Sequence, residues 1–580
     1  MFRLAKYLKH YKKELIIGPF FKLMEAIFEL IVPLVMASII DIGIKNNDKS
    51  FVLQRGGLIL LLGVAGLIFA LICQYSAARA SQGFGTKVRN ELYAHISTLS
   101  HAELDQLGTN QLITVITNDV NQMQLAVAML IRLVVRAPFL VMGAAVMAMM
   151  IDFKLSLIFL AVIPIISFLL YIIMKKSVPF YRARQRLLDN ISLVTRENLT
   201  GARVIRAFSR EEKEERRFEG VNEEATLIAI QVGKLSALLN PAIFILMNLA
   251  IVAIIWFGGI RINTGKLTQG ELIAMINYMT QISLALVVVA NLVVIFTKAA
   301  ASAGRINKVL DTKSTLIQGS HRDNEEEVRR QGPLISLKQV SFAYPDSEEY
   351  ALEEISFDIE EGETIGIIGG TGSGKSTLIN LLPRLYEATK GEILLEGKSL
   401  RDYTFDTLRK HFGVAPQKAV LFLGSIKDNL RMAKEDATEE EMKRAIKTAQ
   451  AEEFISKFPQ GLNHKIAQNG KNLSGGQRQR LTIARALVGR PKILILDDSL
   501  SALDYATDAR LRKALREDCR DMTVIMVSQR AGTIMHADKI IVLEDGRIVG
   551  IGKHSDLLQG CEVYKEICLS QFSEEEAKRA

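Results

Sequence analysis

The sequence predicts a multi-domain membrane protein, in which an all-α region with six membrane-spanning helices precedes an α/β domain. Three observations lead to this fold class. The 580 residues exceed what one compact core usually holds. Hydrophobic residues make up 49% of the chain while charged residues still make up 23%, so an apolar part and a soluble part must coexist. The long apolar stretches lie before residue 300, and short apolar strands alternate with helices after residue 334.

Six stretches in the first part are apolar enough to cross a bilayer, which takes about 20 residues of helix. They run over residues 15–39, 58–75, 128–150, 155–174, 238–260 and 272–296. A single stretch of this kind fits a buried helix of a soluble core equally well. Six in succession indicate an all-α transmembrane domain.

The intervals between the spans indicate how the domain is oriented. Short loops join spans one to two and three to four, whereas about fifty and about sixty polar residues separate spans two from three and four from five. Lys87, Arg89, Lys175 and Lys176 lie in these long intervals close to the span ends, and positive residues gather on the cytosolic side of membrane proteins. We therefore expect the long loops, and with them both termini, in the cytosol.

The net charge of +9 does not indicate a nucleic-acid-binding protein. The early basic residues flank apolar segments and form no single patch, so their position relative to the membrane explains them better. The four cysteines show no C-x-x-C spacing and indicate neither a zinc site nor a disulfide framework. We expect no nucleic-acid partner, and a lipid bilayer around the first domain.

A polar segment, 312–333, separates the two domains. Residues 321–327 read His-Arg-Asp-Asn-Glu-Glu-Glu, a composition typical of a linker. We therefore expect a transmembrane domain over 1–311, with two cytosolic loops, and a soluble domain over 334–580.

A glycine-rich loop follows the apolar strand 364–368. It fits the pattern G-x-x-x-x-G-K-[ST] and precedes a helical run, which is the context that this phosphate-binding motif needs. Backbone N–H groups of such a loop surround phosphate oxygens, and the helix N-terminus adds its positive dipole end. We expect Lys375 to contact the β- and γ-phosphates and the Ser376 hydroxyl to bind Mg²⁺. The loop residues are Gly369, Gly370, Thr371, Gly372, Ser373, Gly374, Lys375, Ser376 and Thr377.

A second apolar strand, 493–496, ends in Asp497 and Asp498. Fully apolar strands are typical of a buried parallel sheet, and a carboxylate at the C-terminal end of such a strand projects toward the nucleotide. We expect Asp497 to hold the Mg²⁺ shell and Asp498 to face the attacking water. An acidic pair after a strand is otherwise often a helix cap. The phosphate loop upstream instead predicts a P-loop nucleotide-binding domain that takes ATP and Mg²⁺.

A second anion site precedes the apolar helix 478–487. It consists of Ser474, Gly475, Gly476 and Gln477, again at a helix N-terminus. One phosphate loop cannot use two such sites on the same phosphate. We therefore expect this site to face a nucleotide that is held by a partner domain in a head-to-tail pair.

Together these motifs resemble the ATP-binding-cassette exporter family over essentially the whole chain, and residues 473–477 match that family's signature. The resemblance implies that Tyr344 stacks on adenine and that Gln417 links Mg²⁺ to the transmembrane loops. It implies that Asp504 belongs to a loop, 501–504, that crosses the dimer interface. Residues 105–110 and 201–208 resemble the family's two coupling-helix regions. The resemblance also implies a multi-pass protein of a bacterial plasma membrane.

Two positions depart from the family pattern. Asp498 stands where the family has a glutamate, and Gln529 stands where it has a histidine. Aspartate is one methylene shorter, so its carboxylate should fall short of the water that a general base must reach. Glutamine can bond a γ-phosphate but cannot become cationic. We therefore expect a degenerate catalytic site in a heterodimer, whose other half is competent and uses the intact signature of this chain.

The substrate is the least determined feature. Glu25 and Glu29 lie one helical turn apart in the first span, where carboxylates are costly. They either attract cationic amphiphiles in a substrate cavity or are neutralised by Lys22 and other structural contacts. The resemblance implies an ATP-hydrolysing translocase for multidrug efflux, which moves drugs or other amphipathic small molecules. Alternatives are a lipid or peptide exporter half and a non-transporting regulatory ATP-binding subunit.

Overall fold

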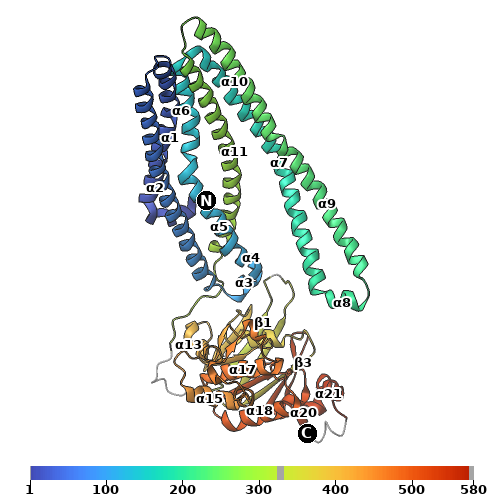
Figure 1. Ribbon diagram of the computed structural model, residues 1–580. Coiled ribbons are helices and arrows are strands. Elements are labelled where there is room, and N and C mark those ends of the chain that lie inside the picture. The colour runs from blue at the N-terminus through green and yellow to red at the C-terminus, as the bar shows by residue number, and fades with distance from the viewer. Residues whose placement is uncertain (1, 323–331, 346, 574–580) are drawn as a thin grey trace. The chain divides into compact units, whose positions relative to one another are not determined.

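The computed structural model describes residues 2–322, 332–345 and 347–573, so residues 323–331 of the predicted linker lie outside the described part. The chain forms two compact units, whose elements are labelled in Figure 1. The first comprises Met1–His95 and Asn110–Asp311, and the second comprises Ile96–Thr109 and Thr312–Ala580. The second unit therefore includes a short segment from between two of the membrane helices.

In the first unit, the described residues contain six helices that are long and apolar enough to cross a membrane. They cover Arg3–Ile44, Lys49–Ile96, Thr109–Ile151, Phe153–Thr200, Pro241–Asn263 and Gln269–Asp311. The predicted six-helix, all-α class of this region is confirmed. Most of the helices extend well beyond the predicted spans, because helical sequence continues after the apolar sequence has ended.

The first unit is all helical: it begins with the 3-10 helix η1, and the three short π-helical turns η2, η3 and η4 lie between α1 and α6. In chain order they are η1 Phe2–Tyr11, α1 Lys12–Ser38, η2 Ile39–Ile44, α2 Lys49–Ile96, α4 Thr109–Thr114, η3 Val115–Asp119, α5 Val120–Met129, η4 Leu130–Val134, α6 Arg136–Ile151, α7 Phe153–Thr200, α8 Ala202–Ala207, α9 Glu211–Ala237, α10 Leu239–Asn263 and α11 Gln269–Asp311. Figure 1 shows α7 and α9 side by side, joined at their ends by α8.

Small side chains bring the helices of this unit close together. Ala26 of α1 and Ala144 and Ala148 of α6 are fully buried in one apolar cluster. The Tyr278 hydroxyl of α11 donates a 2.6 Å hydrogen bond to the carbonyl of Leu30 in α1. Small residues let helix backbones approach in a membrane, and a buried hydroxyl needs a partner there. These contacts give the membrane region a defined core.

The connection between α6 and α7 is shorter than the predicted loop of residues 152–154. Only Asp152 lies outside the two helices. Its carboxylate accepts from the N–H of Leu155 at 2.9 Å and so caps α7, and it also pairs with Arg261 of α10. A capping aspartate ends one helix and begins the next within a single residue.

The second unit is an α/β domain built on a six-stranded sheet, in the strand order β12-β11-β3-β10-β9-β6. Strands β11, β3, β10, β9 and β6 are parallel, and β12 pairs antiparallel with β11. A four-stranded antiparallel sheet, β2-β1-β4-β5, adjoins it. This architecture confirms the predicted α/β nucleotide-binding class.

The strands of this unit are β1 Ile335–Phe342, β2 Leu352–Ile359, β3 Thr364–Gly369, β4 Lys390–Leu395, β5 Lys398–Ser399, β6 Phe412–Ala415, β7 Gly424–Ser425, β8 Lys465–Ile466, β9 Ile493–Asp497, β10 Thr523–Val527, β11 Lys539–Glu544 and β12 Arg547–Gly552. Its helices are α3 His101–Leu107, α12 Lys375–Leu381, α13 Phe405–Lys410, α14 Ile426–Arg431, α15 Glu439–Thr448, α16 Glu452–Ile455, η5 Gly461–Asn463, η6 Gln468–Gly470, α17 Gly475–Val488, α18 Tyr505–Asp518, α19 Ala531–Ile534, α20 His554–Gly560 and α21 Glu562–Leu569.

The described part of the predicted linker is bonded to the α/β domain. The N–H of Gly319 donates to the carbonyl of Tyr403 at 3.1 Å, and that of His321 donates to Asp402 at 2.8 Å. Thr315 donates to the carboxylate of Glu103 through both its N–H (3.1 Å) and its hydroxyl (2.8 Å). Residues 312–322 thus join the segment around α3 to the domain, and we call them the strap.

Candidate nucleotide site

The glycine-rich loop connects β3 to α12 and encloses the ammonium of Lys375. Gly372 and Gly374 have φ of +86° and +93°, which favours glycine. The Lys375 side chain is buried, and its Nζ donates to the carbonyls of Gly369 at 2.9 Å and Gly370 at 2.6 Å. A side chain at Gly370 or Gly372 would meet no atom within 4 Å. The outer backbone of the loop is therefore open to a ligand.

The charge of Lys375 is only partly balanced in this site. Burial lowers the pKa of the Lys375 ammonium, while the nearby carboxylates of Asp498 and Asp497 raise it. The carbonyls that hold its Nζ carry only partial negative charge. Phosphate oxygens would stabilise the ammonium far better, so the lysine favours an anionic ligand.

Ser376 and Asp497 lie together at the C-terminal end of β9. The Ser376 hydroxyl lies 3.2 Å from Oδ1 of Asp497 and donates to it. Burial raises the pKa of the Asp497 carboxyl, and the hydrogen bond from Ser376 opposes that effect. A hydroxyl and a carboxylate oxygen at this separation form a hard-oxygen set of the kind that Mg²⁺ prefers.

Asp498 follows in a left-handed conformation, with φ of +42°. Its N–H donates to the carbonyl of Val527 at 2.9 Å, and its carbonyl accepts from the Ser501 hydroxyl at 2.7 Å. Burial raises the pKa of its carboxyl. The backbone that carries this carboxylate is thus held on both sides.

Gln417 and Gln529 follow the strands β6 and β10, which lie on either side of the strand that precedes Asp498. Gln417 follows β6, and its Nε2 lies 3.4 Å from Oδ2 of Asp498. Gln529 lies just after β10, next to β9, with its side chain exposed. The structure therefore brings Lys375, Ser376, Asp497, Asp498 and Gln417 into one site, with Gln529 on the neighbouring strand end.

Tyr344 lies beside the helix of the phosphate loop. Its hydroxyl is 3.0 Å from that of Thr377, and its ring meets that of Tyr386 edge-on at 5.6 Å. Tyr386 in turn donates a 2.6 Å hydrogen bond to Asp105, which lies in α3. Burial, with the Asp105 carboxylate as a further cause, raises the pKa of the Tyr386 phenol. Sequence reasoning missed Tyr386, because one aromatic in a loop carries no motif.

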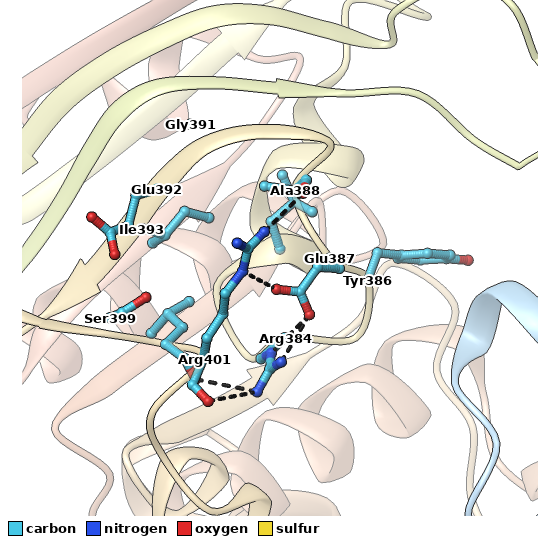
Figure 2. A pocket seen from close by; sticks show the side chains of 11 residues that line it. Arg384, Tyr386, Glu387, Ala388, Gly391, Glu392, Ile393, Ser399 and Arg401 are labelled. Carbon is cyan, nitrogen blue, oxygen red and sulfur yellow. Dashed lines mark hydrogen bonds and ion pairs between the residues drawn. The ribbon is translucent and has the colours of Figure 1, made fainter. Parts of the chain in front are cut away.

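A small cavity next to Tyr386 is structural. Figure 2 shows the guanidinium groups of Arg384 and Arg401 directed at Glu387, with Nη2–Oε2 and Nε–Oε1 distances of 2.8 Å and 2.5 Å. Arg384 also donates to the carbonyl of Ile317 in the strap at 2.9 Å. The cavity measures about 20 Å³, room for about one water molecule. It is therefore too small for a substrate.

The signature segment forms a capping box at the N-terminus of α17. Ser474 caps α17: its hydroxyl accepts from the N–H of Gln477 at 3.2 Å, and the Gln477 side chain accepts from the N–H of Ser474 at 2.8 Å. A side chain at Gly475 would meet no atom within 4 Å, and one at Gly476 would approach the carbonyl of Ala502. Asp504 similarly caps α18, accepting from Thr507 at 2.9 Å. The signature and the loop 501–504 thus form one exposed edge.

Glu25 and Glu29 of the first membrane helix are both paired with cations. Glu25 accepts from Nζ of Lys22 at 2.6 Å, and Glu29 accepts from Arg136 of α6 at 2.6 Å. These contacts favour the structural alternative over a substrate-binding role. The partner Arg136 could not be anticipated from the sequence, because it lies on another helix.

The residues of the site fit a magnesium nucleotide by their own chemistry. Lys375 is a buried cation with incomplete charge compensation, the loop glycines leave room for phosphates, and Ser376 with Asp497 offers oxygen ligands. Tyr344 presents an aromatic ring at the edge of the loop. This arrangement can hold a triphosphate, orient its terminal phosphate and bind a divalent ion.

Comparisons with known proteins give a consistent result. Residues 15–286 match the model of the "ABC transporter transmembrane region", and residues 352–501 match the model "ABC transporter". The chain is 37% identical over 575 residues to the uncharacterized ABC transporter ATP-binding protein YfiB of Bacillus subtilis, covering 99% of both chains. It is 34% identical to an ATP-dependent lipid A-core flippase of Hahella chejuensis, over 87% of this chain and 85% of that one.

A solved structure has the same fold. It is described as a bacterial Atm1-family ABC exporter with ATP bound, and it aligns with a TM-score of 0.82 at 24% identity. The alignment covers 97% of this chain and 99% of that one. At this identity, the likeness concerns the fold.

Proposed function

Because the chain belongs to the ATP-binding-cassette transporter family, as a half-transporter with one transmembrane region and one nucleotide-binding domain, we propose that it is the degenerate subunit of a heterodimeric exporter. In this proposal its own ATP site binds but hydrolyses slowly. Its signature, Ser474–Gln477, completes the productive site of a partner half that carries competent catalytic residues.

The geometry of Asp498 carries this proposal. Its backbone is anchored to Val527 and Ser501, and its φ is already in the left-handed region. The backbone therefore cannot move forward to compensate for the methylene that aspartate lacks relative to glutamate. A general base must come within about 3 Å of the proton it removes. Gln529, on the next strand end, can donate a hydrogen bond but supplies no positive charge.

Binding of Mg²⁺ and ATP requires none of the altered groups. Lys375 would hold the phosphates, Ser376 and Asp497 would hold the ion, and Tyr344 would stack on the base. Mg²⁺ at this position would neutralise phosphate charge. We propose that ATP retained here stabilises the closed pairing of the two halves and shifts their conformational equilibrium, without a hydrolysis step in each cycle.

We propose that the protein lies in a bacterial plasma membrane with both termini in the cytosol. The basic residues near the cytosolic ends of the helices support this orientation. The ATP site would then face the cytosolic ATP pool, and transport would be outward.

The proposed substrate is an amphipathic molecule that reaches the transmembrane region from the bilayer, in the manner of drug efflux. One observation favours a lipid as the second candidate: relatives at 30–34% identity are named lipid A-core flippases. The pairing of Glu25 with Lys22 and of Glu29 with Arg136 gives less support to a selective attraction of cations.

Two measurements test the proposal. The purified chain, shown by mass spectrometry to be free of a partner half, should turn over ATP slowly. In the heterodimer, Asp498→Asn should lower ATP turnover by less than about twofold. Changing the partner's expected glutamate to glutamine should lower ATP turnover by about 10²-fold or more. Rapid turnover by the isolated chain, or equal damage by both changes, would show that this chain has a working catalytic site.

A further inference from the structure

A residue that follows the helix α21 contacts the loop that carries Gln529. Gln571 lies just after α21, and its side-chain amide makes two hydrogen bonds to this loop. Its Nε2 donates to the carbonyl of Gln529 at 2.8 Å, and its Oε1 accepts from the N–H of Ala531 at 2.9 Å. One side chain thus bridges the two peptide groups on either side of Arg530.

The bond between the N–H of Ala531 and Oε1 of Gln571 caps a helix that the neighbouring residues do not cap. Ala531 is the first residue of the short helix α19, and the N–H groups of a first helical turn need acceptors from outside the helix. Arg530 occupies the N-cap position, where its side chain makes no capping bond and has no acceptor to offer. Gln571 supplies the missing cap from another part of the chain.

The backbone that carries the Gln571 side chain is anchored to the helix α21. Tyr564 and Cys568 of α21 are fully buried, and the backbone N–H groups of Gln571 and Phe572 both donate to the carbonyl of Cys568. The Phe572 ring lies against Gly532 of α19, where an added Cβ would approach it to 3.0 Å. Gln571 therefore has little freedom to follow the loop if the loop moves.

We infer that Gln571 is a positioning residue of the ATP site, which orients Gln529 toward the terminal phosphate by fixing the Gln529 carbonyl and the N–H of Ala531, on either side of Arg530. This inference rests on the proposed role of Gln529 as the group that contacts the γ-phosphate. The N–H of Ser528 donates to the carbonyl of Ile367, and the N–H of Arg530 donates to the Ser528 hydroxyl. The Arg530 side chain also donates to the carbonyl of Ser501. None of these three bonds involves the Gln529 carbonyl, which accepts from Gln571.

Loss of the Gln571 bonds should affect ATP and ADP binding differently. In the proposed site the Gln529 side chain contacts the γ-phosphate, which ADP lacks. Loss of the side-chain orientation should therefore weaken ATP binding and leave ADP binding unchanged. Gln571→Ala in the full-length heterodimer should therefore lower the affinity for fluorescent ATP about three- to tenfold, the range of one or two hydrogen bonds, with no change for fluorescent ADP. In the nucleotide-free protein, hydrogen exchange at Ala531 should become faster.

Three further variants complete the experiment. Gln529→Ala should show the same ATP-specific loss, and its combination with Gln571→Ala should lose no more than either alone. Gln571→Glu should keep the slow exchange of Ala531, through its acceptor, and still lose affinity for ATP, because it has no donor for Gln529. Gln559→Ala, an exposed glutamine on α20, is the matched control and should change neither affinity.

If Gln571→Ala weakened ATP binding and ADP binding equally, Gln571 would have a purely structural role and the inference would be overturned. The inference would also be overturned if the losses of ATP affinity were additive in the double variant, or if Gln571→Ala left ATP affinity unchanged. The proposed function fails separately: if Lys375→Ala leaves ATP binding unaltered, this loop is not the nucleotide site, whatever Gln571 does.

Discussion

The N–H of Asp498 donates to the carbonyl of Val527 at 2.9 Å, and this bond joins the ends of the two strands that precede Asp498 and Gln529, the residues proposed for the catalytic positions. Asp498 follows β9, and Gln529 lies two residues beyond Val527, the last residue of β10. The two side chains that depart from the family pattern are thus fixed to one another through the backbone. Their effects on hydrolysis should be coupled for the same reason.

Restoring both groups should revive hydrolysis at this site. We expect Asp498→Glu combined with Gln529→His to raise turnover by about 10²-fold or more, the usual range for a positioned general base, while each single change gives less. The measurement is ATPase activity of a heterodimer whose partner has lost its own catalytic glutamate. Lys375→Ala in the restored chain is the control and should abolish the gain. No gain despite intact ATP binding would contradict the assignment of these two residues.

Ser474 should have two separable roles. Ser474→Ala removes the cap of α17 and should lower the free energy of unfolding by about 1 kcal/mol, together with the ATPase activity of the partner's site. Ser474→Asp keeps a capping oxygen and should retain the stability, but its negative charge should still repel the partner's phosphates and abolish activity. Thermal unfolding and ATPase measurements on both variants check this. If the aspartate variant remains active, the signature does not face a nucleotide.

The contact between Glu103 and the strap should depend on pH. Burial alone would raise the pKa of Glu103, but hydrogen bonds from Ser100 and Thr315 outweigh it, and the net pKa lies below the ordinary value of 4.5. Because the folded-state pKa is lowered, this stabilisation is complete above about pH 4.5 and is lost as the pH falls through the folded-state value. The protection factor of the Thr315 amide, which is its intrinsic exchange rate divided by its observed rate, should therefore decrease below pH 4.5.

Glu103→Gln is the matched variant for that measurement. It keeps an acceptor but cannot titrate, so it should remove the pH dependence of the protection factor at Thr315. Glu103→Ala should lower the free energy of unfolding by about 2 kcal/mol, as expected for lost hydrogen bonds to a charged group. An unchanged pH profile in the glutamine variant would assign the effect to another residue.

Replacing Glu25 and Glu29 together distinguishes the two interpretations of these carboxylates. Since Glu25 and Glu29 are paired with Lys22 and Arg136, we expect Glu25→Gln with Glu29→Gln to reduce transport of cationic and neutral dyes alike, through loss of helix packing. Arg136→Gln should reproduce the effect of Glu29→Gln. The assay is dye transport in vesicles that contain the heterodimer. A loss confined to cationic dyes would instead support a substrate-binding role.

The sequence was sufficient for the fold class and for the family, because these depend on local patterns: apolar runs of bilayer length, strand–loop–helix motifs and the signature. It was insufficient where the determinant is a contact between distant residues. Arg136 lies on another helix from Glu29. Tyr386 and Gln571 make their side-chain hydrogen bonds to residues far along the chain. The roles assigned to the individual site residues remain predictions, which the experiments above address.

The length of the membrane helices has a mechanical consequence. α2 and α7 each contain 48 residues, about 72 Å of helix, against about 30 Å of bilayer core. A rod of this length is a lever: a tilt of about 10° moves a point ~40 Å from the pivot by ~7 Å. α7 contains Pro164 and Pro179, where a helix can bend, while no proline interrupts α2. α2 is thus the stiffer of the two helices. Because it ends at Ile96, close in sequence to Glu103, a tilt of α2 would displace the segment that Glu103 bonds to the strap.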